Sequence, residues 1–175
     1  MIKTPTLLLM VASLALPSLA MGDTLELPAD AQVEMEVVDD LVLDAQTPRR
    51  DDIVLRPVDG GDGSHQLPDH CVVIGDAQRD GERIRLTTHA LTCIEAEGGD
   101  SEIYSGELTA GAYDSDGRFG IAACDDDQCR LAPGDSFLLT LTSPLRIEQQ
   151  ANPSAELNVE RRQANPDQDD AAGGE

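Results

Sequence analysis

The chain has 175 residues, with 34 acidic side chains against 12 basic ones and only two tyrosines and two phenylalanines. So acidic a chain repels phosphate backbones, which excludes nucleic acid as an expected ligand, and so few rings disfavour a sugar-binding or base-stacking surface. The length suffices for one domain with a core, and that core must be mainly aliphatic.

The first 20 residues have the features of a secretory signal peptide. Lys3 gives a positive start, residues 7–16 form an apolar run too short to cross a bilayer as a helix, and small residues at 18 and 20 precede a cut before Met21. Cleavage removes the one lysine and no acid, so the remaining 155 residues carry 11 arginines and 34 acids, a net charge of −23. We expect a periplasmic or secreted protein without membrane insertion, whose charge forms a solvated acidic shell.

Four cysteines remain after cleavage, and an even number in an exported chain indicates two disulfides. Four cysteines can form two disulfides in three different arrangements. We favour the arrangement in which each disulfide joins neighbours in sequence, Cys71–Cys93 and Cys124–Cys129. A metal site that combines Cys71 with the nearby histidines is the alternative, but the spacings match no common zinc pattern.

The first half of the mature chain predicts short strands separated by turns. Residues 21–30 are expected to be a loose lead. Residues 31–38 alternate apolar and polar side chains, which is typical of a half-buried strand, and residues 41–43 continue the apolar signal. Residues 47–52 predict a turn or loop, and residues 53–57 a short strand that ends at its proline.

A glycine-rich loop over residues 59–65 leads to the central strands. The continuous apolar run at residues 71–74 predicts a strand covered on both faces. A hairpin turn is expected at Asp80-Gly81. Residues 84–88 alternate again, but the phase shifts at His89-Ala90, which predicts a β-bulge.

The remaining segments extend this pattern. Residues 103–113 predict one long strand, 114–117 a turn, 118–123 a strand, 124–129 a stapled loop and 137–141 an alternating strand. The sum is seven to nine short strands, which indicates an all-β fold, a small barrel or sandwich over residues 31–147.

Residues 148–175 are predicted to be a mostly disordered acidic tail. They are rich in Asn, Gln, Asp, Pro and Gly. A short helix near residues 155–162 is compatible with this composition.

Two groups of aspartates are the candidate metal ligands. Asp114 and Asp116 resemble the start of a calcium loop, but turn chemistry explains the same residues without a metal. Asp125, Asp126 and Asp127 lie between two cysteines, where a solvated loop is the simpler reading. No cofactor is expected, and calcium is the cation that these groups would bind.

No nucleophile motif such as Gly-x-Ser-x-Gly occurs, so we expect a protein without enzymatic activity, with a hydrolase built on one of the three histidines as the alternative. Arg83 and Arg85 share one face of their strand. They form a candidate docking face for a carboxylate-rich partner. Cross-strand pairing with Asp or Glu is the simpler interpretation.

One further pattern spans residues 67–121. It consists of Cys71 with the following apolar run and Gly75, Glu82-Arg83 with Arg85, Leu91-Thr92-Cys93, Gly106 before an aromatic-bearing strand, Asp116-Gly117-Arg118-x-Gly120, and later Pro133-Gly134-Asp135. This pattern resembles the C-terminal β-barrel region of the TraB/TrbI family, the scaffold proteins of conjugative type IV secretion channels.

The resemblance implies a barrel and supports the pairing of Cys71 with Cys93. It also implies a structural or assembly role in contact with other cell-envelope proteins. The chain departs from the family because it has a cleavable signal in place of the inner-membrane helix, no proline-rich spacer and no helical antenna. We therefore expect a stand-alone periplasmic barrel, with a module that binds a divalent cation or small ligand as the alternative.

Overall fold

The computed structural model describes residues 24–97, 100–114, 116–125 and 127–164. The predicted signal peptide and the last eleven residues of the predicted tail lie outside these ranges. The described residues form eleven strands and one helix: β1 (Thr24–Leu27), β2 (Gln32–Val37), β3 (Leu41–Asp44), β4 (Arg49–Pro57), β5 (Cys71–Asp80), β6 (Arg83–Glu97), β7 (Asp100–Gly106), β8 (Ala110–Tyr113), β9 (Gln128–Leu131), β10 (Ser136–Leu141), β11 (Leu145–Glu148) and α1 (Pro153–Ala164).

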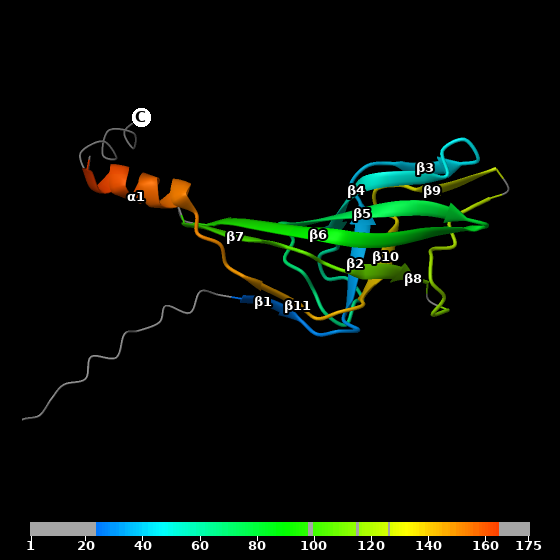
Figure 1. Ribbon diagram of the computed structural model, residues 1–175, viewed down its shortest axis with the longest axis horizontal. Coiled ribbons are helices and arrows are strands. Elements are labelled where there is room, and N and C mark those ends of the chain that lie inside the picture. Colours follow the sequence, from blue (N-terminus) through cyan, green and yellow to red (C-terminus); the bar gives the residue numbers. More distant parts are fainter. Residues whose placement is uncertain (1–23, 98–99, 115, 126, 165–175) are drawn as a thin grey trace, which may run out of the picture.

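Six strands close into a barrel, so the all-β prediction is confirmed and its barrel alternative is the one observed. The ring runs β5-β4-β2-β10-β8-β6, and pairing of β5 with β6 closes it. All of these pairs are antiparallel. Strands β6 and β7 continue beyond the barrel as an arm that points toward α1, and the β1–β11 ribbon runs beside it (Figure 1). Because the ring is closed, each of its six strands has a hydrogen-bonded neighbour on both sides, and none of the six is an edge strand.

The alternation read from the sequence sets the inward face of the barrel. In β2, Val33, Met35 and Val37 are at most 2% exposed, whereas the glutamates between them face outward. The same period of two buries Phe137, Leu139 and Leu141 in β10. The core is mainly aliphatic, as the composition requires, and the inward-facing side chains of the ring strands fill it.

The predicted bulge is present in β6. Ile74 pairs with Ala90 and Gly75 with Thr88, so His89 is the extra residue. Gly75 lies at this irregularity because a Cβ there would come 2.4 Å from the carbonyl oxygen of Thr87. The predicted hairpin is also confirmed, since Asp80 pairs with Arg83 across a two-residue loop in which Gly81 has a φ of 61°.

Four predictions of loop or strand positions are wrong. The lead is not loose throughout, because β1 pairs with β11, a partner more than a hundred residues away. The predicted turn at residues 47–52 is largely strand, since β4 begins at Arg49 and absorbs an irregularity between Arg50 and Ile53, where Asp52 has a φ of 55°.

The predicted long strand at residues 103–113 is interrupted between β7 and β8. Leu108, which lies between the two strands, is buried in the core, and its backbone carbonyl accepts a hydrogen bond from the side chain of Thr88. Residues 118–123 make only isolated bridges, for example Ile84 with Ile121, so the strand predicted there is absent.

Helix α1 is longer than the segment predicted at residues 155–162. Pro153 is its first residue and Asn152 precedes it. Both residue types are favoured at these positions, asparagine as the N-cap and proline in the first helical position, because the first N–H groups of a helix have no intrahelical acceptor.

Candidate functional site

Arg83, one of the two arginines predicted to dock a partner, is engaged within the chain. Its guanidinium lies 3.0 Å from a carboxylate oxygen of Asp116 and 3.5 Å from one of Asp114, and it donates a 2.7 Å hydrogen bond to the carbonyl oxygen of Gly120. Only 17% of the side chain is exposed. Arg83 therefore fixes the turn after β8 against β6, and its charge is already compensated.

Arg85 remains more accessible. Its side chain is 53% exposed, pairs with Asp80 on the neighbouring strand, and lies 5.7 Å from the ring centroid of Phe119. The Phe119 ring in turn covers Gly111, where a Cβ would come within 2.8 Å of it. Both arginines thus follow the simpler interpretation, pairing with nearby acids.

The aspartates predicted as metal ligands serve local structure. Asp114 and Asp116 face the guanidinium of Arg83, and Asp116 also accepts the backbone N–H of Arg118. In the loop between the cysteines, Asp125 accepts the N–H groups of Gln128 and Asp127, which lowers the pKa of its carboxyl group. Asp126 lies outside the described residues. Within the part of the chain that the structure describes, no group of three or more His, Cys, Asp or Glu side chains is arranged to hold a metal.

Both predicted disulfides are formed. Cys71 and Cys93 are direct cross-strand partners on β5 and β6, and both are buried. Cys124 and Cys129 close the short loop before β9. Two disulfides indicate an oxidising compartment. Arg79 joins the second loop to the barrel, because its guanidinium donates to the carbonyl oxygen of Asp127 at 2.9 Å.

The three histidines lie apart on the exterior, each beside a local partner. The nearest contacts are Ser64 Oγ to His65 Nδ1 at 3.0 Å, His70 Nδ1 to Asp69 at 3.4 Å, and His89 Nε2 to Asp52 at 3.7 Å. The Ser64 hydroxyl also accepts the backbone N–H of Gln32, so it fixes the glycine-rich loop to β2. Among the described contacts, no carboxylate orients the Ser64–His65 pair as a hydrolytic triad requires.

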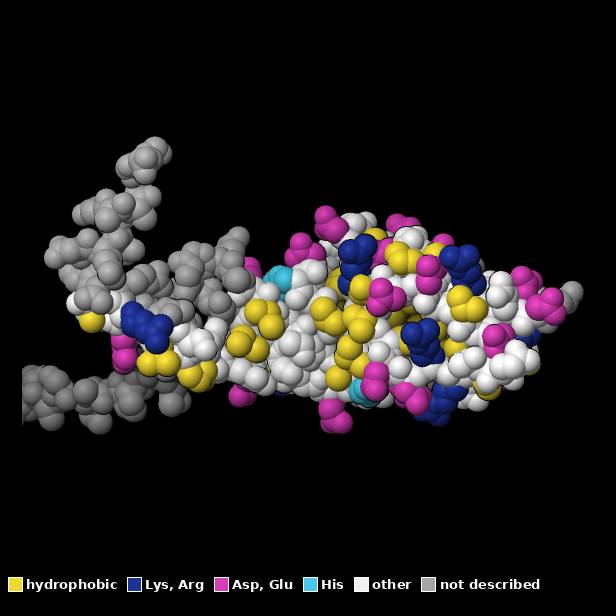
Figure 2. Space-filling model, turned by 90° about the horizontal axis from the view of Figure 1, so that it is seen from above, with side chains coloured by type: hydrophobic (Ala, Val, Ile, Leu, Met, Phe, Trp, Pro, Cys, Tyr) yellow, Lys and Arg dark blue, Asp and Glu magenta, His cyan; other side chains and the backbone are white. Residues whose placement is uncertain are grey.

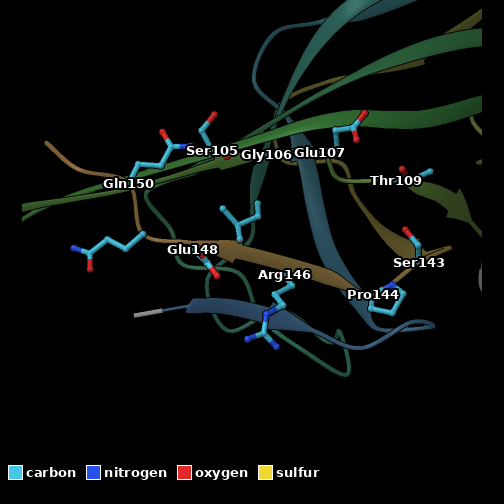
Figure 3. A pocket seen from close by; sticks show the side chains of 11 residues that line it. Ser105, Gly106, Glu107, Thr109, Ser143, Pro144, Arg146, Glu148 and Gln150 are labelled. Atoms are coloured by element: carbon cyan, nitrogen blue, oxygen red, sulfur yellow. Dashed lines mark hydrogen bonds between the residues drawn. The ribbon is translucent and has the colours of Figure 1, made fainter. Parts of the chain in front are cut away.

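A groove of about 640 Å³ lies between the end of β7 and β11 (Figure 3). At one end Gln150 donates from its amide to the carbonyl oxygen of Ser105 at 2.9 Å. Arg146 extends toward β1, where it pairs with Glu26 at 2.8 Å. Gly106 lets the side chain of Ile147 pack against β7, since a Cβ there would lie 3.0 Å from it. The groove is open and polar, and its one arginine is paired.

A smaller cavity of about 240 Å³ opens on the outer face of β2, β10 and β8. We name it the carboxylate cavity. Its lining is Glu34, Asp62, Tyr113, Asp114, Ile121, Ser136, Phe137 and Leu138. The sequence analysis missed it because these residues come from five separate segments. The alternation of β2 and β10 marks Glu34 and Leu138 as outward-facing but does not show that they are neighbours.

The sequence analysis also missed an apolar surface on the opposite wall of the barrel. The run at residues 71–74 was predicted to be covered on both faces, but Val72 is 39% exposed and Ile74 half-buried. Ile94 on the β6–β7 arm is 53% exposed. Figure 2 shows hydrophobic side chains gathered on this face, over β5, β6 and the arm. In the sequence, the signal for this surface was that the outward as well as the inward positions of residues 71–74 in β5 are apolar.

No protein-family model matches the chain, and no curated protein matches it. No helix in the described ranges has the length and apolar character needed to cross a membrane.

Proposed function

We propose that the protein is a periplasmic, non-enzymatic assembly module that docks other cell-envelope proteins, similar to the barrel module of conjugative type IV secretion scaffolds. A secretory signal, two disulfides and a closed barrel support an exported and rigid module. The observation that carries the proposal is the apolar surface on the outside of β4 to β7.

We call this surface the aliphatic strip. It comprises Val54, Val72, Ile74, Ala90, Ile94 and Ile103. Strand register places these side chains side by side, because Ile74 pairs with both Val54 and Ala90, and Ile94 pairs with Ile103. Thr92 and Ser105, which are also paired, fill the space between them without a charge.

A neutral strip is unusual on this protein. The chain carries 34 acids and 12 basic residues, yet none of the eight outward positions of the strip and its Thr92–Ser105 pair is charged. Contiguous exposed apolar surface on an otherwise polar protein marks an interaction site, because burial of that surface against a partner removes it from water, which is favourable. The strip therefore replaces Arg83 and Arg85 as the proposed docking face.

Gene deletion in the source organism, followed by measurement of conjugative transfer, tests the proposal. Deletion should reduce transfer, and the wild-type gene should restore it. The double variant Val72→Thr with Ile94→Thr should fail to restore transfer, because threonine keeps the strand preference but adds polar groups to the strip. Val42→Thr is the matched control, since Val42 is 37% exposed on β3, outside the strip.

Two outcomes would count against the proposal. Unchanged transfer after deletion contradicts the role in conjugation. Full complementation by the double variant, at wild-type protein level and melting temperature, contradicts the strip as the docking surface.

A further inference from the structure

The carboxylate cavity lies on the side of the barrel opposite the aliphatic strip. In the ring of six strands β10 is three steps from β5 in either direction. Leu138 of β10 forms the floor, because it pairs with Glu34 of β2 on one side and with Tyr113 of β8 on the other. The cavity is thus a row of three outward side chains, with the glycine-rich loop bordering it at Asp62 and Ile121 bordering it beside Tyr113.

Two carboxylates in the cavity lack a basic partner among the described residues. Glu34 accepts the backbone N–H of Asp62, and neither side chain is in an ion pair there. By contrast, the next outward acid of β2, Glu36, pairs with Arg56. The third carboxylate, that of Asp114, faces Arg83. The cavity therefore carries an excess of negative charge.

Glu34 is held in its ionised form. The hydroxyl of Ser136 and the N–H of Asp62 both donate to its carboxylate, and these hydrogen bonds lower the pKa of Glu34 despite the opposing effect of burial. The two contacts fix the direction of the carboxylate, and the one from Asp62 also holds the loop against β2, so the anion is preorganised.

The apolar residues of the lining distinguish between a metal ion and an organic cation as the ligand. Calcium takes six to eight oxygen ligands, whereas this cavity offers the leucine floor, Ile121 and the Tyr113 ring beside its carboxylates. A guanidinium is weakly hydrated, stacks on aromatic rings and pairs with a carboxylate through two parallel hydrogen bonds. The cavity volume of about 240 Å³ is smaller than that of sites for drug-sized ligands, and it suits one guanidinium group on a short aliphatic stem.

We infer that the carboxylate cavity binds a small organic cation, a guanidinium group on a short aliphatic stem. The stem lies on Leu138 and Ile121, and the guanidinium lies between the ring of Tyr113 and the carboxylates of Glu34 and Asp62. This inference does not depend on the proposed docking role, because it concerns a different wall of the barrel.

Titration of the purified exported protein with butylguanidinium, followed by calorimetry and NMR, tests the inference. Butylguanidinium should bind, and its neutral isostere butylurea should not bind measurably under the same conditions. Resonances of Tyr113 and Leu138 should shift on binding. Glu34→Gln and Asp62→Asn should each weaken binding by about tenfold, because each removes a charge-assisted contact. Asp62→Asn is the safer variant, since the Asp62 carboxylate makes no hydrogen bond or ion pair among the described residues.

Glu36→Gln is the matched control, because Glu36 lies on the same face of β2 but outside the cavity; it should change the dissociation constant by less than about twofold. Equal binding of butylurea, or unchanged affinity in both Glu34→Gln and Asp62→Asn, would overturn the inference. Absence of binding by the folded wild-type protein would overturn it as well.

Discussion

The hydroxyl of Thr88 donates a 2.8 Å hydrogen bond to the carbonyl oxygen of Leu108. The hydroxyl oxygen of Thr88 in turn accepts the backbone N–H of Ala110 at 3.0 Å. Thr88 is only 5% exposed, and it is the one buried polar side chain among the described residues. The chain between β7 and β8 leaves the sheet, so the carbonyl of Leu108 and the N–H of Ala110 have no partner on a neighbouring strand. The hydroxyl of Thr88 supplies the hydrogen bonds that both groups need.

Thr88→Val should therefore lower the free energy of unfolding by about 1–3 kcal/mol, because valine keeps the shape but leaves a buried carbonyl and a buried N–H unpaired. Urea unfolding followed by circular dichroism measures the change. Thr87→Val is the control, since Thr87 is exposed on the adjacent position. An equal effect of the two substitutions would show that the hydroxyl of Thr88 has no special role.

The second prediction separates the two arginines of β6. Arg83→Gln should cost about 1–3 kcal/mol of unfolding free energy, because the carbonyl oxygen of Gly120 and two carboxylates lose a charged donor in a partly buried site. Arg85→Gln should stay within about 0.5 kcal/mol, since an exposed ion pair contributes little. Thermal melts of both variants measure the difference, and a larger loss for Arg85→Gln would contradict the structural role of Arg83.

Local features of the barrel could be predicted from the sequence because they depend on neighbours along the chain. The alternation of β2 follows from the two-residue period of a strand. The turn at Gly81 follows from its tolerance of positive φ. The bulge at His89 follows from the change of parity between Leu86 and Leu91, both of which are buried.

The contacts that define the candidate sites could not be predicted in this way. Arg83 reaches Asp116 across 33 positions of sequence, and Glu34 holds the N–H of Asp62 across 28. Both depend on how the barrel closes. Val72 was assigned to a covered strand because a continuous apolar run does not reveal which face water reaches.

The third prediction concerns the disulfides. Replacing Cys71 and Cys93 together by alanine should lower the free energy of unfolding by about 3 kcal/mol, and replacing Cys124 and Cys129 by about 2 kcal/mol, because the first pair closes a longer loop in the unfolded chain. Guanidinium chloride unfolding of the two double variants measures both losses. A larger loss for the Cys124–Cys129 pair would show that native contacts of the short loop, such as that of Arg79, outweigh loop length.

The fourth prediction concerns acid. The backbone N–H of Thr47, and less strongly that of Gln46, donates to the carboxylate of Asp44 and lowers its pKa from the ordinary value of 3.8. Because the folded state holds this proton less tightly than the unfolded chain, the ionised carboxylate stabilises the fold above the unfolded-state pKa. That contribution is lost as the pH falls through the lower, folded-state pKa.

Asp44→Asn isolates this contribution, since asparagine keeps an acceptor oxygen but does not titrate. At neutral pH the variant should melt below the wild type, and the two melting temperatures should converge as the pH falls below about 3.8. Acidification also neutralises other carboxylates and so relieves the overall acidic repulsion, which would stabilise both proteins. The melts are therefore made in about 1 M salt, where the Debye length is near 3 Å and this repulsion is screened. Asp59→Asn controls for loss of a charge at a carboxylate without these contacts. A difference between Asp44→Asn and the wild type that does not shrink as the pH falls below the unfolded-state value of 3.8 would contradict the assignment.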